Sequence, residues 1–386
     1  MGHTQGDIRA RMAAKMLNED FQKALDRITS KSSEIDAMTA DQKKIISDKL
    51  TDTADYIDNF GPISDIKNYF VEVKGFSEGD WDNIEKLLQK ESDSSLKAFT
   101  NYIKNPVSVD YFTKMTSPTD VPSQMEKDFG LPKRVVGELF SMEGKQKSGK
   151  GVGRGELFLG FMINGATNAS VGDVNVDGQP YEVKAKDARL NTQNGFGTGQ
   201  QAILSFFKEF GKRQINMYVW SKYSMNKASK TTIQEFNFLK GGKSRFYDLF
   251  QDVAAESNNP KKDLHTVFEL LADTMFCSTS GIWMNASSSI RDGVVDAFKK
   301  YVNDDGTPSD DTMLNYALMW QNILYYQSQE YFNGIFLIEP KVKKLAYLPV
   351  SSSNDMTGWL SKNVKYTQPS WQDKPTSDAW KISLNK

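Results

Sequence analysis

The 386-residue sequence contains one cysteine and two histidines. The single thiol, Cys277, excludes an internal disulfide and any zinc site built from cysteines, and it fits a reducing compartment. Of the two histidines, His265 lies in a segment with helical apolar spacing and is expected on the surface of that helix. Catalysis by a Ser-His-Asp triad, a Cys-His pair or a histidine-rich metal centre is therefore nearly excluded. Carboxylates, lysines and a hard divalent cation remain as the groups that could carry out catalysis.

Long apolar segments are absent as well. No stretch reaches the about eighteen consecutive apolar residues of a membrane-spanning helix, and the N-terminus lacks the charged-then-apolar pattern of a secretory leader. We therefore expect a protein of the cytoplasm that has no membrane partner. With 39% hydrophobic and 12% aromatic residues, the chain can bury a large core and is long enough for two or three domains.

Net charge is almost zero, at −1, but the charges are unevenly distributed. Residues 145–245 carry sixteen Lys and Arg against seven Asp and Glu, so this segment has a charge of +9 and the rest of the chain −10. A basic block in an otherwise acidic protein is typical of a surface that meets phosphate groups, whether of a nucleic acid or of a nucleotide. A solvated lysine-rich surface without a ligand is the simpler alternative.

Changes in pattern divide the chain into three regions. Residues 1–135 predict a helical accessory domain, with helices at about 79–90 and 93–104. Residues 136–245 alternate short helix and strand patterns, and residues 246–386 predict a mixed region of helices and strands. The elements expected in this last region are helices at about 262–276, 288–302 and 310–328 and a strand pair at 331–340 and 344–350.

The most unusual stretch is E-G-K-Q-K-S-G-K-G-V-G-R-G-E, residues 143–156, with five glycines and four cations. It nearly matches the phosphate-binding loop G-x-x-x-x-G-K-[ST], but Gly151 stands where the loop needs a hydroxyl, and no convincing strand precedes it. A nucleotide-hydrolysing enzyme is therefore not expected. We interpret the stretch as a flexible basic loop that holds a nucleic-acid backbone. Its contacts would come from Lys145, Lys147, Lys150 and Arg154.

A hairpin is predicted directly after this stretch. The apolar run E-L-F-L-G-F-M-I predicts a short buried helix with Glu156 in its first turn, and V-G-D-V-N-V-D-G-Q-P-Y-E-V-K-A-K alternates on both sides of Asp177-Gly178. A two-residue turn at Asp177-Gly178 pairs Val174 with Tyr181 and places Asp173 opposite Glu182. Asp173, Glu182 and Lys184 then share one face, and the apolar residues form the other.

Two carboxylates facing each other across a strand pair repel one another unless a positive group lies between them. Hard oxygen ligands at this spacing suit Mg²⁺ or Mn²⁺, which can stabilise charge on a phosphoryl group while Lys184 neutralises more of it. Charged residues on the solvent face of a hairpin, without any function, are the alternative. The pattern therefore predicts a divalent-metal site that cleaves phosphodiester bonds.

The helix acid Glu156, the acid Asp173 and the motif Glu182-Val183-Lys184 together resemble the PD-(D/E)XK nuclease superfamily, which includes phage-encoded members. The resemblance covers about residues 150–220. It implies a restriction-endonuclease-like α/β (α+β) fold with a mixed sheet flanked by helices, in the order helix, three strands, helix, strand. The second helix is expected at 200–210 and the last strand at 215–220.

The resemblance implies a Mg-dependent deoxyribonuclease with DNA as its partner, acting in phage DNA processing or restriction. Asp173, Glu182 and Glu156 would hold the Mg²⁺ or Mn²⁺ ion, and Lys184 would complete the catalytic set. A phage-encoded member would be found in the bacterial host cytoplasm or in the virion. Further DNA contacts are expected from Lys186, Arg189 and Gln200.

Several alternatives stay open from the sequence. A protein that keeps the nuclease fold without catalysis, such as a virion or DNA-packaging component that binds DNA, fits the same pattern. The N-terminal helical region is a candidate docking site for a protein partner, and self-association into a homo-oligomer is equally open.

Overall fold

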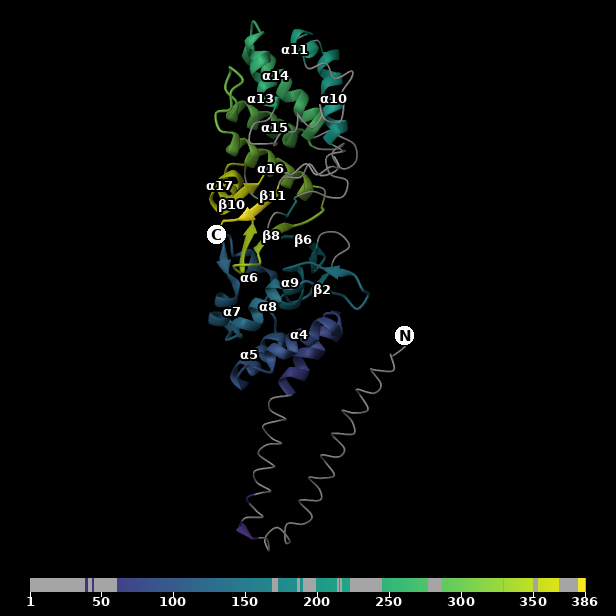
Figure 1. Ribbon diagram of the computed structural model, residues 1–386, viewed down its shortest axis with the longest axis vertical. Helices are drawn as coiled ribbons and strands as arrows, with labels where there is room; N and C mark the ends of the chain where they lie inside the picture. Colours follow the sequence, from purple (N-terminus) through teal and green to yellow (C-terminus); the bar gives the residue numbers. More distant parts are fainter. Residues whose placement is uncertain are drawn as a thin grey trace. The chain divides into compact units, whose positions relative to one another are not determined.

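The structure is a computed structural model of the full chain (Figure 1). The chain divides into two compact units, Met1–Pro62 and Ile63–Lys386. In the first unit only Thr39, Ala40, Lys44, Gly61 and Pro62 are described, and the account below concerns the second. The residues described in the second unit are 63–168, 173–185, 188–189, 199–213, 215, 217–222, 245–276, 287–328, 330–349, 353–367 and 381–385.

The second unit begins with helices that pack around one core. Ser77 and Ser92 cap two of them by accepting backbone hydrogen bonds from Asp80 and Ser95, at 3.2 and 3.3 Å. The helices predicted at 79–90 and 93–104 are thereby confirmed. The elements of this part are the π-helix η1 (Tyr69–Val73) and the helices α4 (Glu78–Leu88), α5 (Asp93–Lys104), α6 (Val109–Thr113), α7 (Val121–Phe129), α8 (Lys133–Ser141) and α9 (Glu156–Met162).

A six-stranded sheet with the order β1-β9-β8-β6-β5-β4 crosses this unit. The pair β6 and β8 is parallel, and every other neighbouring pair in the sheet is antiparallel. The strands are β1 (Thr119–Asp120), β4 (Ala166–Asn168), β5 (Val174–Val176), β6 (Gln179–Lys184), β8 (Gly334–Glu339) and β9 (Lys344–Leu348). The predicted strand pair near the C-terminus is confirmed as β8 and β9.

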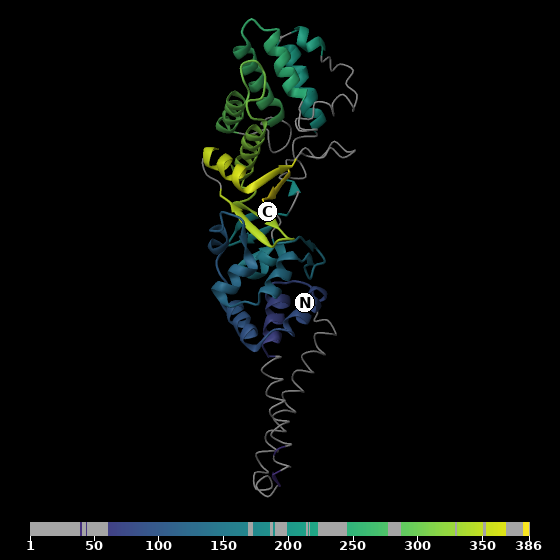
Figure 2. The same ribbon diagram turned by 60° about the vertical axis from the view of Figure 1, so that its left-hand side comes forward.

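The central strand β8 is buried on both faces and separates two hydrophobic cores. Phe336 and Ile338 pack into the core of the helices α4 to α9, whereas Ile335 and Leu337 pack into the core of the C-terminal helices. Because successive side chains of a strand point to opposite faces, one apolar strand can serve both cores. Figures 1 and 2 accordingly show β8 and β6 between the two groups of helices.

The C-terminal helices form the other layer. Those predicted at 262–276, 288–302 and 310–328 are confirmed. A three-stranded sheet, β10-β11-β7, lies in the same part of the unit. The elements are α10 (Gly199–Lys212), α11 (Met217–Lys222), α13 (Arg245–Ala255), α14 (Pro260–Leu271), the π-helix η4 (Ala272–Phe276), α15 (Ser288–Tyr301), α16 (Asp311–Ser328), α17 (Ser353–Asn363), β7 (Ala188–Arg189), β10 (Val364–Thr367) and β11 (Lys381–Leu384).

The strand predicted at 215–220 is wrong, because these residues lead into the helix α11. Val219 is fully buried, and the indole of Trp220 donates a 3.1 Å hydrogen bond to the carbonyl of Phe207 in α10. A short apolar run fits either a strand or a buried helix by its periodicity alone. The strand that lies parallel to β6 is instead β8, far along the chain.

The predicted class, a mixed α/β protein with a mixed sheet flanked by helices, is confirmed at that level. The six-stranded sheet takes strands from all three regions predicted from the sequence, since β1, β6 and β8 fall within residues 1–135, 136–245 and 246–386. Among the described residues, no helix is both long enough and apolar enough to span a membrane.

Candidate nuclease site on the central sheet

The hairpin of β5 and β6 forms as its local sequence predicts. Asp177 and Gly178 both have positive φ, 52° and 83°, as the two-residue turn that suits twisted strands requires. Val176 pairs with Gln179 and Val174 with Tyr181, so the predicted register is confirmed up to that pair. The buried face carries Val174, Val176, Tyr181 and Val183.

Asp173 departs from the predicted pairing. The ladder ends at Val174 and Tyr181, so Asp173 is not a ladder partner of Glu182. Its backbone N–H donates to the carbonyl of Tyr181 at 2.9 Å, and its Oδ2 accepts the N–H of Val183 at 2.8 Å. The carboxylate therefore takes the place of a main-chain acceptor, which fixes its position against β6.

Lys184 connects the two carboxylates. Its Nζ lies 3.5 Å from Oδ2 of Asp173 and contacts Oε1 of Glu182 at ion-pair distance. The three side chains are only 17 to 25% exposed, so solvent screens these contacts far less than it screens surface pairs. The structure thus brings together the three hairpin residues predicted for the site.

Glu156 joins this cluster from the first residue of α9. It opens α9, whose apolar residues pack in the core of the N-terminal helices, and its charge interacts with Asp173, Lys184 and Glu182. Two glycines make this possible. A Cβ on Gly153 would lie 2.3 Å from Oε1 of Glu156, and a Cβ on Gly155, which has a φ of 77°, would lie 2.3 Å from Ile338. The glycines therefore let α9 begin directly beside the sheet.

Burial and charge together set the ionisation of the cluster. Burial, and then the neighbouring charge of Asp173, raise the pKa of Glu156 to about 7, and a backbone hydrogen bond from Gly153 opposes this. Burial also raises the pKa of Glu182, although Lys184 opposes it. For Lys184, burial lowers the pKa, but Glu182 and Asp173 outweigh burial and raise it overall. The lysine is therefore charged at neutral pH, whereas Glu156 titrates there.

The pKa of Glu156 has a measurable consequence for stability. Because the folded carboxyl has a pKa of about 7 instead of 4.5, it keeps its proton where the unfolded chain loses it, and stability falls as pH rises through this interval. We expect Glu156→Gln to raise the free energy of unfolding by about 1–2 kcal/mol at pH 8, after discounting for solvent screening, and to leave it unchanged at pH 4. Urea unfolding at both pH values measures the difference.

Glu138→Gln provides the control for this measurement, because Glu138 is an exposed glutamate of the neighbouring helix α8. It should change stability equally at the two pH values. An equal effect of Glu156→Gln at pH 4 and pH 8 would contradict the proposed ionisation of Glu156.

The glycine-lysine stretch is a hairpin and not the flexible loop expected from sequence. It pairs β2 (Gly144–Lys145) with β3 (Gly151–Val152). The backbone of Lys145 accepts a hydrogen bond from Ser77 and donates one to Asp80, and the N–H of Lys147 donates to Gly75. These contacts come from distant residues, so the sequence of the stretch alone could not reveal them.

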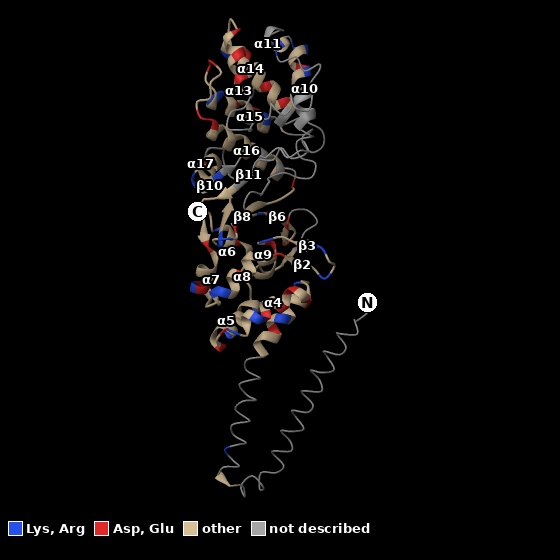
Figure 3. Ribbon diagram, viewed as in Figure 1, with Lys and Arg blue, Asp and Glu red and all other residues tan. Residues whose placement is uncertain are grey.

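The cations of this stretch are exposed, and Figure 3 shows their positions in blue along the ribbon of β2, β3 and the residues between them. Lys147 pairs with Glu72 at 2.8 Å and Arg154 with Glu143 at 3.0 Å, with all four side chains 45 to 67% exposed. Such exposed pairs contribute only about 0–1 kcal/mol, so a nucleic-acid phosphate could replace the acid in each. Lys145 and Lys150 are exposed as well.

The structure describes the remaining predicted DNA-binding residues only in part. Lys186 lies outside the described residues. Arg189 belongs to β7, where its backbone pairs with Lys381, and Gln200 belongs to the first turn of α10. The side chains of Arg189 and Gln200 are not described, so their part in binding DNA stays a prediction.

Glu339 is a candidate residue that the sequence did not suggest. Glu182 pairs with Ile335 and Lys184 with Leu337, so the next residue of β8 on this face is Glu339. Its side chain is only 4% exposed, and a buried carboxylate at the end of an apolar strand is costly without a role. The only signal in the sequence is an acid that ends the apolar run G-I-F-L-I-E.

The donor set of the site consists of carboxylate oxygens, which suit Mg²⁺ or Mn²⁺. The contacts of Lys184 use Oδ2 of Asp173 and Oε1 of Glu182, so a second oxygen of each acid lies outside these contacts. In the described part of the chain, no group of three or more histidines, cysteines or acids is arranged to hold a metal ion. The binding of a divalent ion by Asp173, Glu182 and Glu156 therefore stays a prediction.

Comparison of the chain with protein-family models, with curated proteins and with solved structures gave no match.

Proposed function

We propose that the protein is a divalent-metal-dependent DNA endonuclease whose site is formed by Asp173, Glu182, Lys184 and Glu156. The observation that carries the proposal is the contact of one partly buried lysine of β6 with two carboxylates of the same hairpin, one on β6 and one directly before β5. Surface pairs are usually exposed and worth little, whereas a compact acid-lysine cluster with a raised glutamate pKa is typical of functional sites.

The order of elements supports the same proposal. The chain passes from α9 through the antiparallel strands β4, β5 and β6 and the two-residue strand β7 to the helix α10. Further helices follow before β8, which lies parallel to β6. Apart from β7 and these inserted helices, the order matches the succession that resemblance to the PD-(D/E)XK superfamily implies. The first of these strands is only three residues long, which agrees with the short interval between Glu156 and Asp173.

Each side chain has a chemical role in this proposal. A divalent cation held by Asp173 and Glu182 would supply Lewis-acid stabilisation of the charge on the phosphoryl group. Lys184, which carries its charge at neutral pH, would neutralise further charge as the bond breaks. Glu156, with a pKa of about 7, can accept or release a proton at the same pH.

A protein that binds DNA without cleaving it is the second candidate. The position of Lys184 favours it, since an amine already in contact with both carboxylates neutralises them without a metal ion. In that case the cluster would stabilise the sheet. The basic hairpin formed by β2, β3 and the residues between them, 144–152, would bind DNA as part of a virion or packaging component.

Incubating the protein with duplex, branched and single-stranded DNA in Mg²⁺ and in EDTA distinguishes the two candidates. We expect cleavage of at least one substrate in Mg²⁺ only, and its loss in Asp173→Ala and Lys184→Ala. Cleavage that persists in both variants would show that other residues catalyse it. If no substrate is cleaved and the variants bind DNA as tightly as the unchanged protein, the non-catalytic candidate is favoured.

The basic hairpin should contribute to binding whether or not the protein cleaves DNA. Replacing Lys145, Lys147 and Lys150 by Gln should weaken DNA binding and reduce the slope of log K against log salt by about one for each phosphate that the hairpin no longer neutralises. Fluorescence anisotropy over a range of salt concentrations measures both quantities. Unchanged affinity and slope would leave the hairpin with a purely structural role.

A further inference from the structure

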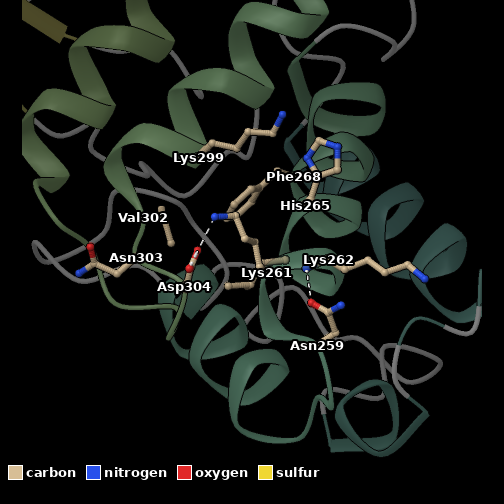
Figure 4. Close-up of a pocket in the computed structure, with 10 residues that line it drawn as sticks. Asn259, Lys261, Lys262, His265, Phe268, Lys299, Val302, Asn303 and Asp304 are labelled. Atoms are coloured by element: carbon tan, nitrogen blue, oxygen red, sulfur yellow. Dashed lines mark hydrogen bonds and ion pairs between the residues drawn. The ribbon is translucent and has the colours of Figure 1, made fainter.

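A hollow of about 550 Å³ lies among the C-terminal helices, away from the residues of the proposed nuclease site (Figure 4). It is lined by α14, by the last turn of α15 and by the segment that follows α15. Four of its lining side chains are basic, and one is a carboxylate. The basic residues are Lys261, Lys262, His265 and Lys299, and the acid is Asp304.

The basic side chains of this hollow have only weak partners. Lys261 lies 3.8 Å from Asp304, Lys299 lies 3.6 Å from Asp296, and Nε2 of His265 lies 3.6 Å from Glu269. A charge-assisted hydrogen bond to an anion is shorter, at about 2.7–2.9 Å. These pairs are largely solvated and are worth little, so an incoming anion can displace them.

His265 adds a second indication. Its Nδ1 is shielded from solvent and has no hydrogen-bond partner in the part of the chain that the structure describes. Since Nε2 is held only by the long contact with Glu269, internal hydrogen bonds do not fix the ring. Nε2, whose long contact with Glu269 an anion can displace, is therefore the nitrogen able to donate to a ligand in the hollow, beside Lys299 (Figure 4).

The floor of the hollow is closely packed. Phe268 is 3% exposed and stacks on Phe298, with ring centroids 5.0 Å apart, so the helices α14 and α15 that carry the lysines are packed together. Lys262, in contrast, extends away from the other basic residues in Figure 4. Lys261, His265 and Lys299 are therefore the residues best placed to act on one ligand.

We propose that this hollow, defined by Lys261, His265 and Lys299, binds a phosphate-bearing ligand. Compact ammonium groups on two helices suit the charge of a phosphate, and Asp304 limits affinity by occupying Lys261. The phosphate can belong to a nucleic-acid backbone or to a small free phosphate compound. The site does not depend on the proposed cleavage of DNA, since it shares no residue with the cluster around Lys184.

The test measures binding without cleavage, in EDTA, with a short labelled duplex and separately with inorganic pyrophosphate. We expect Lys261→Gln with Lys299→Gln to weaken binding of one of these ligands about tenfold. Asp304→Asn should tighten it, because Lys261 is then released. Loss of duplex binding alone identifies a nucleic-acid contact, and loss of pyrophosphate binding alone identifies a small-molecule site.

Lys300→Gln is the matched control, because it removes the same charge from the residue next to Lys299. The ammonium of Lys300 lies over the ring of Tyr301, and Lys300 does not line the hollow. If the control weakens binding as much as the double variant, or if neither ligand responds to any of the changes, the proposal is wrong. A failure to cleave DNA would contradict the proposed function and leave this test unaffected. Thermal unfolding of each variant establishes that the helices remain folded.

Discussion

Replacing Lys184 by methionine is expected to destabilise the protein strongly at alkaline pH and much less at acid pH. The substitution leaves Asp173 and Glu182 close together, partly buried and without their common cation. Removing one partner of a buried ion pair typically costs about 3–5 kcal/mol, and residual exposure reduces this to about 2–3 kcal/mol here. Urea unfolding at pH 8 and pH 5 measures the free energy of unfolding in each case.

The direction of this pH dependence follows from the two carboxylates. Burial and the charge of Asp173 raise the pKa of Glu182, and without Lys184 nothing opposes them. The folded chain then binds protons more tightly than the unfolded chain, so stability is lost as pH rises above about 4.5. At pH 5 protonation should remove most of the penalty. Mg²⁺ should also reduce it at pH 8 if the acids bind the ion, because a ligand that binds only the folded state stabilises it.

Lys145→Met is the control, since it removes an exposed lysine of the basic hairpin. It should change stability by less than about 0.5 kcal/mol at either pH. Equal losses for Lys184→Met at pH 5 and pH 8, with no response to Mg²⁺, would reduce Lys184 to a packing residue and remove the electrostatic basis of the site.

Phe336→Ala should have the second large effect. Phe336 is fully buried in β8, between β6 and β9, and its ring contacts those of Tyr181 and Tyr347 at centroid distances of 5.6 and 5.2 Å. Truncating a buried phenylalanine typically costs about 3–5 kcal/mol, because it removes apolar contacts and leaves a cavity. The same change should lower the affinity for any ligand of Glu182 and Lys184, since β8 supports the strand that carries them.

Val342→Ala serves as the comparison, because Val342 is 40% exposed in the turn that follows β8. It should cost less than about 0.5 kcal/mol. If Phe336→Ala lowers the free energy of unfolding as little as Val342→Ala does, then β8 is not the central strand of this sheet. The assignment of residues 334–339 instead of 215–220 as the partner of β6 would then be wrong.

The hairpin of the site could be predicted because its determinants are local. Asp177-Gly178 specifies the turn, and the alternation around it decides which side chains share a face. Asp173 is the exception, since it leaves the ladder and bonds to Val183 through its side chain. A hydrogen bond of that kind depends on where the strand ends, which the alternation of residues does not specify.

The partner strand of the hairpin could not be predicted from nearby sequence. The apolar run at 215–220 suits either a strand or a helix, and its packing against α10 through Val219 and Trp220 determines that it is helical. The strand at 334–339 was expected, but nothing local indicates that it pairs with β6. Long-range pairing of this kind depends on how the two cores form on either side of the sheet.

The roles of the glycines between the basic hairpin and α9 also depend on contacts with residues distant in the sequence. The sequence suggested flexibility, yet Gly153 makes room for the carboxylate of Glu156, and Gly155 packs against Ile338 of β8. The stretch therefore combines a structural role at the start of α9 with a basic surface.

The rate of DNA cleavage in Mg²⁺, measured under single-turnover conditions for the unchanged protein, Asp173→Asn and Asp177→Asn, tests the central proposal most directly. Asp177 lies in the turn of the same hairpin, where asparagine tolerates its positive φ, so this variant matches the charge change away from the site. We predict that Asp177→Asn cleaves at the unchanged rate and that Asp173→Asn is at least about a hundredfold slower. The absence of Mg²⁺-dependent cleavage of any DNA, or equal rates for all three proteins, would contradict the account.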